Sequence, residues 1–402
     1  MPQNLTAFDA VLKEDYLGTI REQVYMSHVL LNRLEKNEED VVGREAVVPL
    51  HVGGNTGVGA RSDGGPLPTA GNQQYATATY RCRYNYGRIQ VTGPVIKASR
   101  NNKGAFVRAV DSEIQGMTKD LQDDLNRQLH GDGSGVLCLV NTDPTTGTTL
   151  TVDDPGAMYL KKGMKIDIVD PSSVIPGDAR ANASNLTIAS KSSATTVTMS
   201  AALHSDVADN DYVARYGSYA LEMMGIRGIV DVNNPRAGLT VGGINRSTAG
   251  NEYWKANVDA NSGVPRKYSL DLMQSSWDAA EEEGGEISLI LTTRAVRRKY
   301  LALVRADGRF VNTMKMDAGF DALEYNGKPF VVDRHCLPGR IYFLDESTLA
   351  IYRMSDLDWM EEDGAVLSRV SGFDAYEAVL FFYATLGCSA PNRNALLADL
   401  EV

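Results

Sequence analysis

A predicted amphipathic helix between Asn101 and Val136 constrains the fold of this chain more than any other feature. Its apolar residues recur at alternating steps of three and four, which places them along one stripe of a helix. The stripe consists of Val107, Val110, Ile114, Met117, Leu121, Leu125 and Leu129. About 26 residues at roughly 1.5 Å per residue give a rod of about 39 Å. Gly116 lies in the middle of the rod and costs about 1 kcal/mol of helix stability relative to alanine.

The turn from Gly131 to Gly135 is predicted to end this helix. Gly131 can take the left-handed conformation that closes a helix, and Asp132 with Gly133 then turns the chain sharply. The sequence therefore predicts a spine-end turn at Gly131, Asp132 and Gly133.

Residues 51 to 90, just before the rod, are rich in glycine and carry prolines. Connections longer than about 15 residues are uncommon inside compact domains, so this segment predicts a projecting hairpin or a disordered loop. Its return limb, residues 74 to 92, favours strand. An isolated two-stranded hairpin is barely stable in water, so we expect it to lie on another subunit. Candidates for charge-assisted contacts with acidic neighbours are Arg61, Arg81, Arg83 and Arg88, unless these arginines are simply solvated.

Bulk composition excludes several classes of protein. A chain of 402 residues with 43% hydrophobic content is long enough for two or three domains. No apolar run approaches the roughly 20 residues of a membrane span, and no signal peptide is visible. The net charge of −11 argues against dedicated nucleic-acid binding. Four scattered cysteines without a CxxC pair indicate reduced, mostly buried thiols.

The remaining segments alternate between predicted helices and strands. Residues 4 to 36 read as helix. Residues 142 to 218 are rich in Thr, Ser, Asp and Gly, and five strand-like runs there predict a small all-β module of five or six strands, against the alternative of one long disordered loop. The five runs are 149–152, 165–169, 186–190, 196–199 and 212–216. From residue 219 onward mixed α/β patterning returns, with a helix over 269–283 and a final hydrophobic stretch over 376–386.

Motifs that carry chemistry are lacking. The five histidines stand far apart in the sequence, without metal-ligand spacing, and read as surface or satisfied core residues. The glycine-rich stretch around Gly53 to Gly59 lacks the features of a phosphate loop or a dinucleotide fingerprint, and no GxSxG elbow exists. A basic patch at Arg294, Arg297, Arg298 and Lys299 either pairs with a neighbouring subunit or is solvated. We therefore predict no catalytic, cofactor or metal site, and no enzyme.

The order of these parts resembles the major capsid proteins of tailed bacteriophages. The segments 48–53, 71–75 and 87–99 look like that family's approach to its spine helix. The resemblance implies an α+β fold named after phage Hong Kong 97, with an N-terminal arm, an extended β-hairpin loop, a long spine helix, an axial α/β domain and, outside the common core, the inserted β module.

The resemblance also implies a division of the chain. Its parts are an arm (1–50), an extended loop (51–90), a peripheral domain with the spine helix (91–141), the inserted β-rich domain (142–218), an axial domain (219–356), return strands of the peripheral domain (357–383) and a C-terminal segment returning to the axial domain (384–402).

By resemblance, many copies would form pentamers and hexamers of an icosahedral head around packaged double-stranded DNA, which an acidic wall would not grip. Such a protein belongs to the virion capsid, and to the host cytoplasm during assembly. Its partners would be sister copies and, where present, scaffolding, portal and decoration proteins, with no cofactor and no membrane. Some relatives cross-link subunits through a lysine on the extended loop. Residues 51 to 90 hold no lysine, so we expect non-covalent stabilisation by arm and loop exchange.

Three other classes of protein share parts of this pattern. An encapsulin is a shell of the same fold that stores enzyme cargo, and the long loop and arm favour the phage interpretation over it. A soluble enzyme with a β insert lacks a convergent site. A tail or adhesion protein would explain the Thr/Ser-rich insert but not the spine and its terminal turn.

Overall fold

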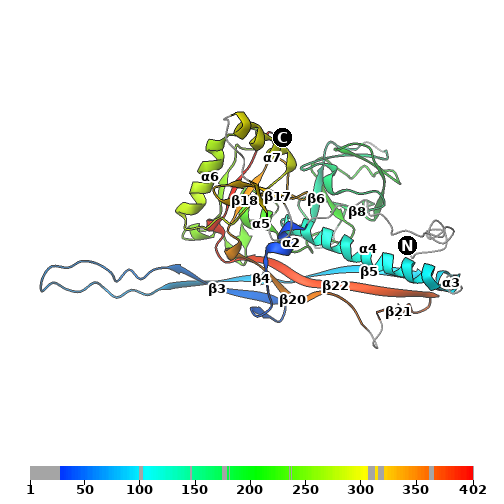
Figure 1. Cartoon of the computed structure of the whole chain (residues 1–402), viewed down its shortest axis with the longest axis horizontal. Helices are drawn as coiled ribbons and strands as arrows, with labels where there is room; N and C mark the ends of the chain where they lie inside the picture. The colour runs from blue at the N-terminus through cyan, green and yellow to red at the C-terminus, as the bar shows by residue number, and fades with distance from the viewer. Residues whose placement is uncertain are drawn as a thin grey trace.

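The protein is described here by a computed structural model. It describes residues 28–98, 103–144, 147–173, 179–180, 182–234, 236, 238–306, 313–315, 321–361 and 366–401, and of residues 96–112 and 305–322 no side chains. Most of the predicted arm and arm helix therefore lie outside the described residues. Four parts are visible in Figure 1: a long helix on a ribbon of strands, a projecting hairpin, a β-barrel and an α/β body.

The spine helix α4 spans Lys103–Leu129 and lies along a ribbon of long strands (Figure 1). In this ribbon β22 (Ala375–Cys388) pairs antiparallel with both β5 (Arg83–Thr92) and β20 (Leu349–Trp359). The sheet is completed by β1 (Glu35–Asn37) beside β20 and by β21 (Ser368–Arg369) beside β22. The short helix α3 (Gly93–Ala98) connects β5 toward the spine. The final hydrophobic stretch over 376–386 lies within β22.

The hairpin is formed by β3 (Glu45–Gly53) and β4 (Gln74–Arg81), with β2 (Val41–Val42) at its edge. Alternate side chains at its base, including Val48, Leu50 and Tyr80, are buried in the main core. Beyond residue 53 the chain runs out from the body and returns at residue 74 (Figure 1). Period-two alternation therefore fixes the base of the hairpin to the body, whereas the glycine-rich tip has no such pattern.

The predicted β module is a closed six-stranded barrel in the order β10-β7-β6-β11-β8-β9. Its strands are β6 (Val136–Val140), β7 (Thr149–Asp153), β8 (Lys165–Val169), β9 (Leu186–Lys191), β10 (Thr196–Met199) and β11 (Tyr212–Arg215), with the 3-10 turn η1 (Ala157–Tyr159) between β7 and β8. All five strand-like runs are confirmed. The barrel encloses its own apolar core, in which Leu150, Ile166 and Val197 are fully buried.

The α/β body contains a seven-stranded sheet in the order β14-β23-β19-β15-β18-β17-β16. Its strands are β14 (Asn257–Asp259), β15 (Leu289–Thr292), β16 (Thr313–Lys315), β17 (Asp321–Tyr325), β18 (Lys328–Val332), β19 (Ile341–Leu344) and β23 (Ala395–Leu397). Around them lie α5 (Ile226–Val230), α6 (Leu270–Glu282), α7 (Arg294–Ala306), the strand pair β12 (Thr240–Val241) and β13 (Ile244–Asn245), and the turns η2 (Glu252–Trp254), η3 (Glu346–Thr348) and η4 (Pro391–Arg393). Ser269 caps α6 by accepting a hydrogen bond from the backbone N–H of Leu272 at 3.2 Å, as its position before the helix predicts.

Two local predictions differ from the structure. The helix predicted over residues 4–36 ends, in its described part, with α2 (Val29–Arg33), because Glu35 to Asn37 form β1 beside β20. The strand predicted over 74–92 is two strands divided at Cys82: β4 pairs within the hairpin and β5 pairs with β22. In both cases a partner that is distant in the sequence decides the backbone conformation.

Candidate assembly interface

The spine-end turn is held together by a buried carboxylate. Asp132 accepts hydrogen bonds from the backbone N–H and the hydroxyl of Ser134, at 3.0 and 2.5 Å, and from Asn234 Nδ2 at 2.8 Å. Its carboxylate also lies 3.6 Å from the Arg236 guanidinium. Burial alone would raise the pKa of Asp132, but Arg236, Arg227 and these hydrogen bonds outweigh burial and lower it.

The predicted role of Gly131 is wrong, although the turn itself is present. Gly131 does not adopt positive φ; the left-handed residues are Gly133 and Gly135, at φ +82° and +77°. The helix instead ends in a tight turn, in which the Gly131 N–H donates to the Gln128 carbonyl at 2.9 Å. The carbonyls at the helix end lie against Gly225, just before α5, where an added Cβ would come within 2.3 Å of Gln128 O. This packing covers the carbonyls at the end of the helix, so the helix ends without a left-handed residue at Gly131.

The stripe of the spine helix is buried progressively toward its C-terminal end. Leu121, Leu125 and Leu129 are buried in the main core, while Ile114 and Met117 are half-buried. Gly116 faces open space, since an added Cβ would meet no atom within 4 Å. The side chains predicted at Val107 and Val110 lie outside the described residues.

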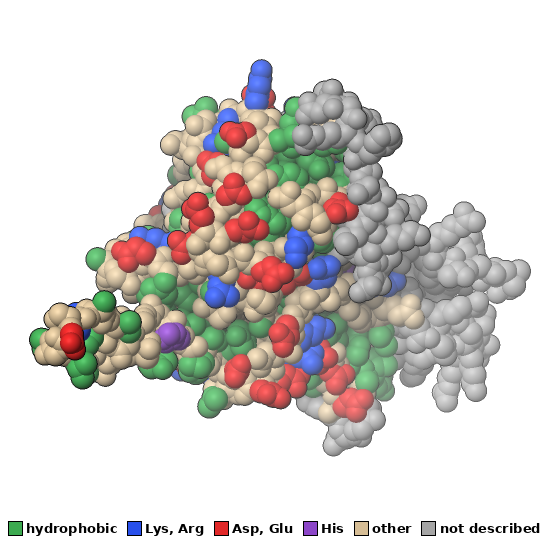
Figure 2. All heavy atoms as spheres, turned by 60° about the vertical axis from the view of Figure 1, so that its left-hand side comes forward, with side chains coloured by type: hydrophobic (Ala, Val, Ile, Leu, Met, Phe, Trp, Pro, Cys, Tyr) green, Lys and Arg blue, Asp and Glu red, His purple; other side chains and the backbone are tan. Residues whose placement is uncertain are grey.

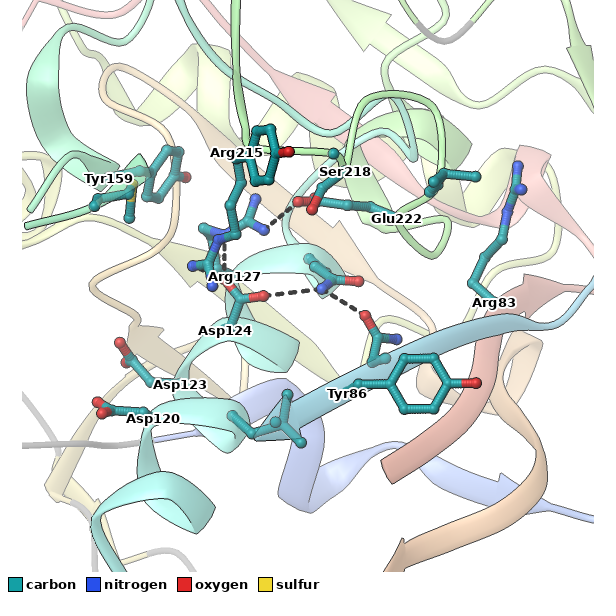
Figure 3. A pocket seen from close by; sticks show the side chains of 18 of the residues that line it. Arg83, Tyr86, Asp120, Asp123, Asp124, Arg127, Tyr159, Arg215, Ser218 and Glu222 are labelled. Atoms are coloured by element: carbon teal, nitrogen blue, oxygen red, sulfur yellow. Dashed lines mark hydrogen bonds and ion pairs between the residues drawn. The ribbon is translucent and has the colours of Figure 1, made fainter. Parts of the chain in front are cut away.

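A groove of about 930 Å³ runs between β5, the spine helix and the barrel. The charged side chains that line it are both basic and acidic: Arg81, Arg83, Arg127, Lys161, Lys162, Lys165, Arg215 and Arg334, with Asp120, Asp123, Asp124 and Glu222. In Figure 3, Arg83 and Tyr86 project from β5, and Asp124 and Arg127 from the spine helix. Basic side chains therefore outnumber acidic ones in the lining of the groove.

The floor of the groove contains a buried ionic network (Figure 3). Arg127 donates to Asp124 Oδ1 at 2.9 Å and to Glu222 Oε1 at 2.5 Å, and Arg215 lies 2.8 Å from Asp124. Burial opposes every charge here, yet Arg127 and Arg215 hold the pKa of Asp124 well below its usual value. Burial raises the pKa of Glu222 more than Arg127 lowers it. This network ties the spine helix to the chain that follows the barrel.

The four arginines predicted as contact candidates occupy three separate places. Arg61 lies on the hairpin tip with its guanidinium 3.1 Å from its neighbour's carbonyl, at Ala60. Arg81 and Arg83 come together at the groove, where burial and the charge of Arg81 lower the pKa of Arg83. Arg88 donates to Glu377 of its own chain at 2.7 Å. The structure thus brings two of the four to one site, and intersubunit contact remains a prediction for all four.

Exposed apolar side chains gather on the hairpin. Val58 and Leu67 are each 86% exposed at its tip, and Tyr75 is 74% exposed at the start of β4. Figure 2 shows the hairpin standing away from the body at the lower left, with hydrophobic side chains on its surface. Large exposed apolar groups on a projecting limb are typical of an interaction surface.

Two further predictions can be compared with the described residues. All four cysteines are buried and free, as predicted, and burial raises the pKa of each thiol. Three histidines that lie far apart in the sequence are buried near the same carboxylate, that of Asp333. They are His28, His130 and His335. This cluster was not predicted from the sequence. Its one local signal is that His130 follows Asn126 by four residues on the buried side of the spine helix. Within the described part of the chain, no helix is long and apolar enough to cross a membrane.

Comparison with known proteins shows the fold. No family profile and no curated protein matches the sequence. A chain of the cyanophage A-1(L) capsid asymmetric unit superposes with a TM-score of 0.61 at 12% identity, covering 97% of this chain and 98% of that one. Weaker similarities include the native GTA particle capsid (TM-score 0.49, 10% identity, 99% of both chains) and the SrpI encapsulin of Synechococcus elongatus PCC 7942 (TM-score 0.46, 9% identity, 100% of this chain and 96% of that one). The chain has the α+β capsid fold that the sequence resemblance predicts, the Hong Kong 97-type fold.

Proposed function

We propose that this chain is a structural subunit, not an enzyme, that self-assembles into pentamers and hexamers of an icosahedral phage head around double-stranded DNA. The observation that supports this most is the hairpin: its base is buried in the main core, while its tip carries Val58 and Leu67 almost fully exposed. The capsid fold, shared with the cyanophage chain, supports the same proposal.

The proposed mechanism is exchange of limbs between copies. A two-stranded hairpin in water lacks a buried face, and covering its apolar side chains on a neighbour supplies one. Burying a valine or leucine side chain contributes about 1.5–3 kcal/mol. Each contact is modest, but every subunit gives one limb and receives another, so a closed shell is tougher than any pair. The basic groove is our candidate for receiving a neighbour's acidic chain.

The test uses the full-length chain and electron microscopy. We expect closed shells from the wild type, and mostly unassembled but folded protein from the double variant Val58→Ser/Leu67→Ser. The matched control is Val264→Ser, because Val264 is also exposed, at 59%, but lies on the α/β body. Sedimentation velocity measures the assembled fraction, and circular dichroism checks the fold.

Two results would change the conclusion. Shells formed equally well by the tip variant would remove the hairpin tip from the proposed contact. A compact, protease-resistant wild-type monomer at high concentration would refute the shell proposal itself. Nuclease-protected DNA in particles from their natural source is expected for a phage head, whereas packaged enzyme in its place would indicate an encapsulin.

A further inference from the structure

A buried cluster of histidine and aspartate connects the spine helix to the α/β body. Asn126 and His130 come from the last turns of the helix, and Asp333 and His335 from the turn after β18. All four residues are buried, and the ligand atoms of His130, Asp333 and His335 lie within 4.8 Å of one another. These residues are about 200 positions apart in the sequence, so only the fold brings them together.

The hydrogen bonding of His130 leaves one ring nitrogen facing a carboxylate. Nδ1 lies 2.8 Å from the Asn126 carbonyl, which only accepts, so Nδ1 carries a proton. Nε2 of the neutral ring then offers a lone pair, and it lies 3.7 Å from Asp333 Oδ2 without any hydrogen-bond partner. Two buried acceptors that face each other repel unless a cation lies between them.

Contacts with two carboxylates also fix the orientation of His335. Its backbone N–H donates to Asp333 Oδ1 at 2.9 Å, and its Nδ1 lies 3.7 Å from the same carboxylate. On the far side of the ring, Nε2 lies 3.4 Å from Asp123 Oδ1. A carboxylate behind an imidazole fixes the tautomer and strengthens the opposite nitrogen as a ligand.

The amide of Asn126 completes the cluster. Its Nδ2 lies 3.0 Å from both Asp333 Oδ2 and His335 Nδ1, while its Oδ1 is buried without a partner. The two ends of an amide have nearly the same shape, so rotation by half a turn exchanges them. After that rotation, Asn126 Oδ1 would occupy the present position of Nδ2 and would be a fourth acceptor in the cluster.

We propose that His130, Asp333 and His335 form a binding site for a divalent transition-metal ion of the Zn²⁺ class, with Asn126 Oδ1 or water as a fourth ligand. Zinc binds imidazole nitrogen and carboxylate oxygen at about 2.0–2.2 Å, so two such ligands at a tetrahedral angle lie about 3.4 Å apart. The observed 3.7 Å separations need to shorten by only a few tenths of an ångström. His335 also lines the basic groove, which gives an ion a path to the site.

Bound metal would pin the end of the spine helix to the sheet of the α/β body. The site would thereby fix the angle between two parts of the subunit, in addition to the apolar contacts of the core and the hydrogen bonds of Asn126. This role is independent of whether the chain forms shells, because all of the proposed ligands belong to one chain.

The test titrates metal-free, full-length protein with Co²⁺ and Zn²⁺. We expect one equivalent of Co²⁺ to give visible absorption bands typical of four- or five-coordinate cobalt, and Zn²⁺ to abolish them. His130→Gln and Asp333→Asn are expected to lose the bands. Asp123→Asn, which removes the carboxylate behind His335 and with it the ion-pair partner of Lys161 and Arg334, is expected to weaken binding about 10- to 100-fold. The control is His204→Gln, which replaces a half-buried histidine between β10 and β11 that is paired at 3.1 Å with Asp206, and it should bind like the wild type.

Failure of the wild-type protein to bind either ion stoichiometrically would overturn the proposal, and this result does not depend on any variant folding. Equal binding by His130→Gln would also overturn the proposal, because it would place the metal elsewhere.

Discussion

Some glycines after the spine helix are constrained both by their backbone conformation and by close packing. Gly135 is left-handed, and an added Cβ would lie 2.7 Å from the Ser218 carbonyl oxygen. Gly163, in the barrel, is left-handed to the same degree at φ +81°, but nothing lies within 4 Å of its added Cβ. The two glycines separate the cost of conformation from the cost of a clash.

We predict that Gly163→Ala destabilises the protein by about 1–2 kcal/mol, the cost of a left-handed alanine. Gly135→Ala should cost clearly more, because the Ser218 backbone must also move. Urea unfolding of both variants, followed by fluorescence, measures the difference. Equal destabilisation would show that the contact at Ser218 relaxes freely.

Asp132 should make stability depend on pH. Its folded pKa is lowered, so its contribution is fully present above the unfolded value of about 3.9 and is lost as pH falls from there toward the folded pKa. Asp132→Asn should lower the free energy of unfolding at pH 7 by about 2 kcal/mol, since hydrogen bonds to a charged group are weakened. It should also flatten the loss of stability below pH 4. Unfolding curves from pH 7 to pH 3 measure both effects, and parallel curves for the two proteins would contradict the assignment.

The residues of the spine-end turn were only partly predictable from the sequence. Glycine followed by aspartate and glycine indicated a sharp turn, but which glycine is left-handed depends on the packing of Gly225 against the helix end. The groove and the histidine cluster were beyond local patterns altogether. In the sequence, the barrel separates Arg127 from its partner Glu222, and the barrel with much of the α/β body separates His130 from Asp333.

Among the elements, the spine helix carries an unexplained glycine in its middle. Gly116 contacts nothing within 4 Å of where a side chain would begin, so close packing does not require it. We predict that Gly116→Ala raises helix stability by up to about 1 kcal/mol, without a steric penalty. Thermal unfolding of the unassembled subunit measures this.

We further propose that Gly116 lets the spine bend in a precursor shell and straighten on expansion. Gly116→Ala should then alter precursor stability or the yield of expanded particles, which electron microscopy counts. Unchanged assembly together with raised subunit stability would leave Gly116 as a purely local defect in the helix.

Strands with a local signature were the elements most open to prediction. The five barrel runs alternate apolar and polar residues between turn signals, and each is present where expected. Closure of the barrel was harder to foresee, because β6 lies before the change in composition and pairs with both β7 and β11. The division of residues 74–92 at Cys82 likewise follows from the pairing of β5 with β22, whose partners are nearly 300 residues apart.

For the whole molecule, the order of parts was predictable and the contacts between them were not. Hairpin, spine helix, barrel and α/β body follow one another along the described part of the chain, and each has its own composition. The placement of these parts depends on a shared core, in which the hairpin base, the spine helix and β22 bury side chains together.

Assembled particles should dissociate to single chains under denaturing conditions. Residues 51–90 contain no lysine, so the hairpin has no amine with which to form an isopeptide bond. We predict a single band near 43.7 kDa when mature shells are boiled in detergent and separated by electrophoresis. Ladders of higher mass that survive reducing agent would refute non-covalent stabilisation.

The attachment of the hairpin to β22 has a mechanical consequence. The Tyr80 hydroxyl, at the hairpin base, donates to the Cys388 carbonyl at the end of β22 at 2.8 Å, and β22 continues beneath the full spine. Hydrogen bonds between antiparallel strands lie across the strand direction. β4 continues through Cys82 into β5, which pairs antiparallel with β22. Tension applied by a neighbour along the hairpin would therefore pull β3 and β4 together and load the β5–β22 ladder in shear, so that its hydrogen bonds resist at once rather than one by one.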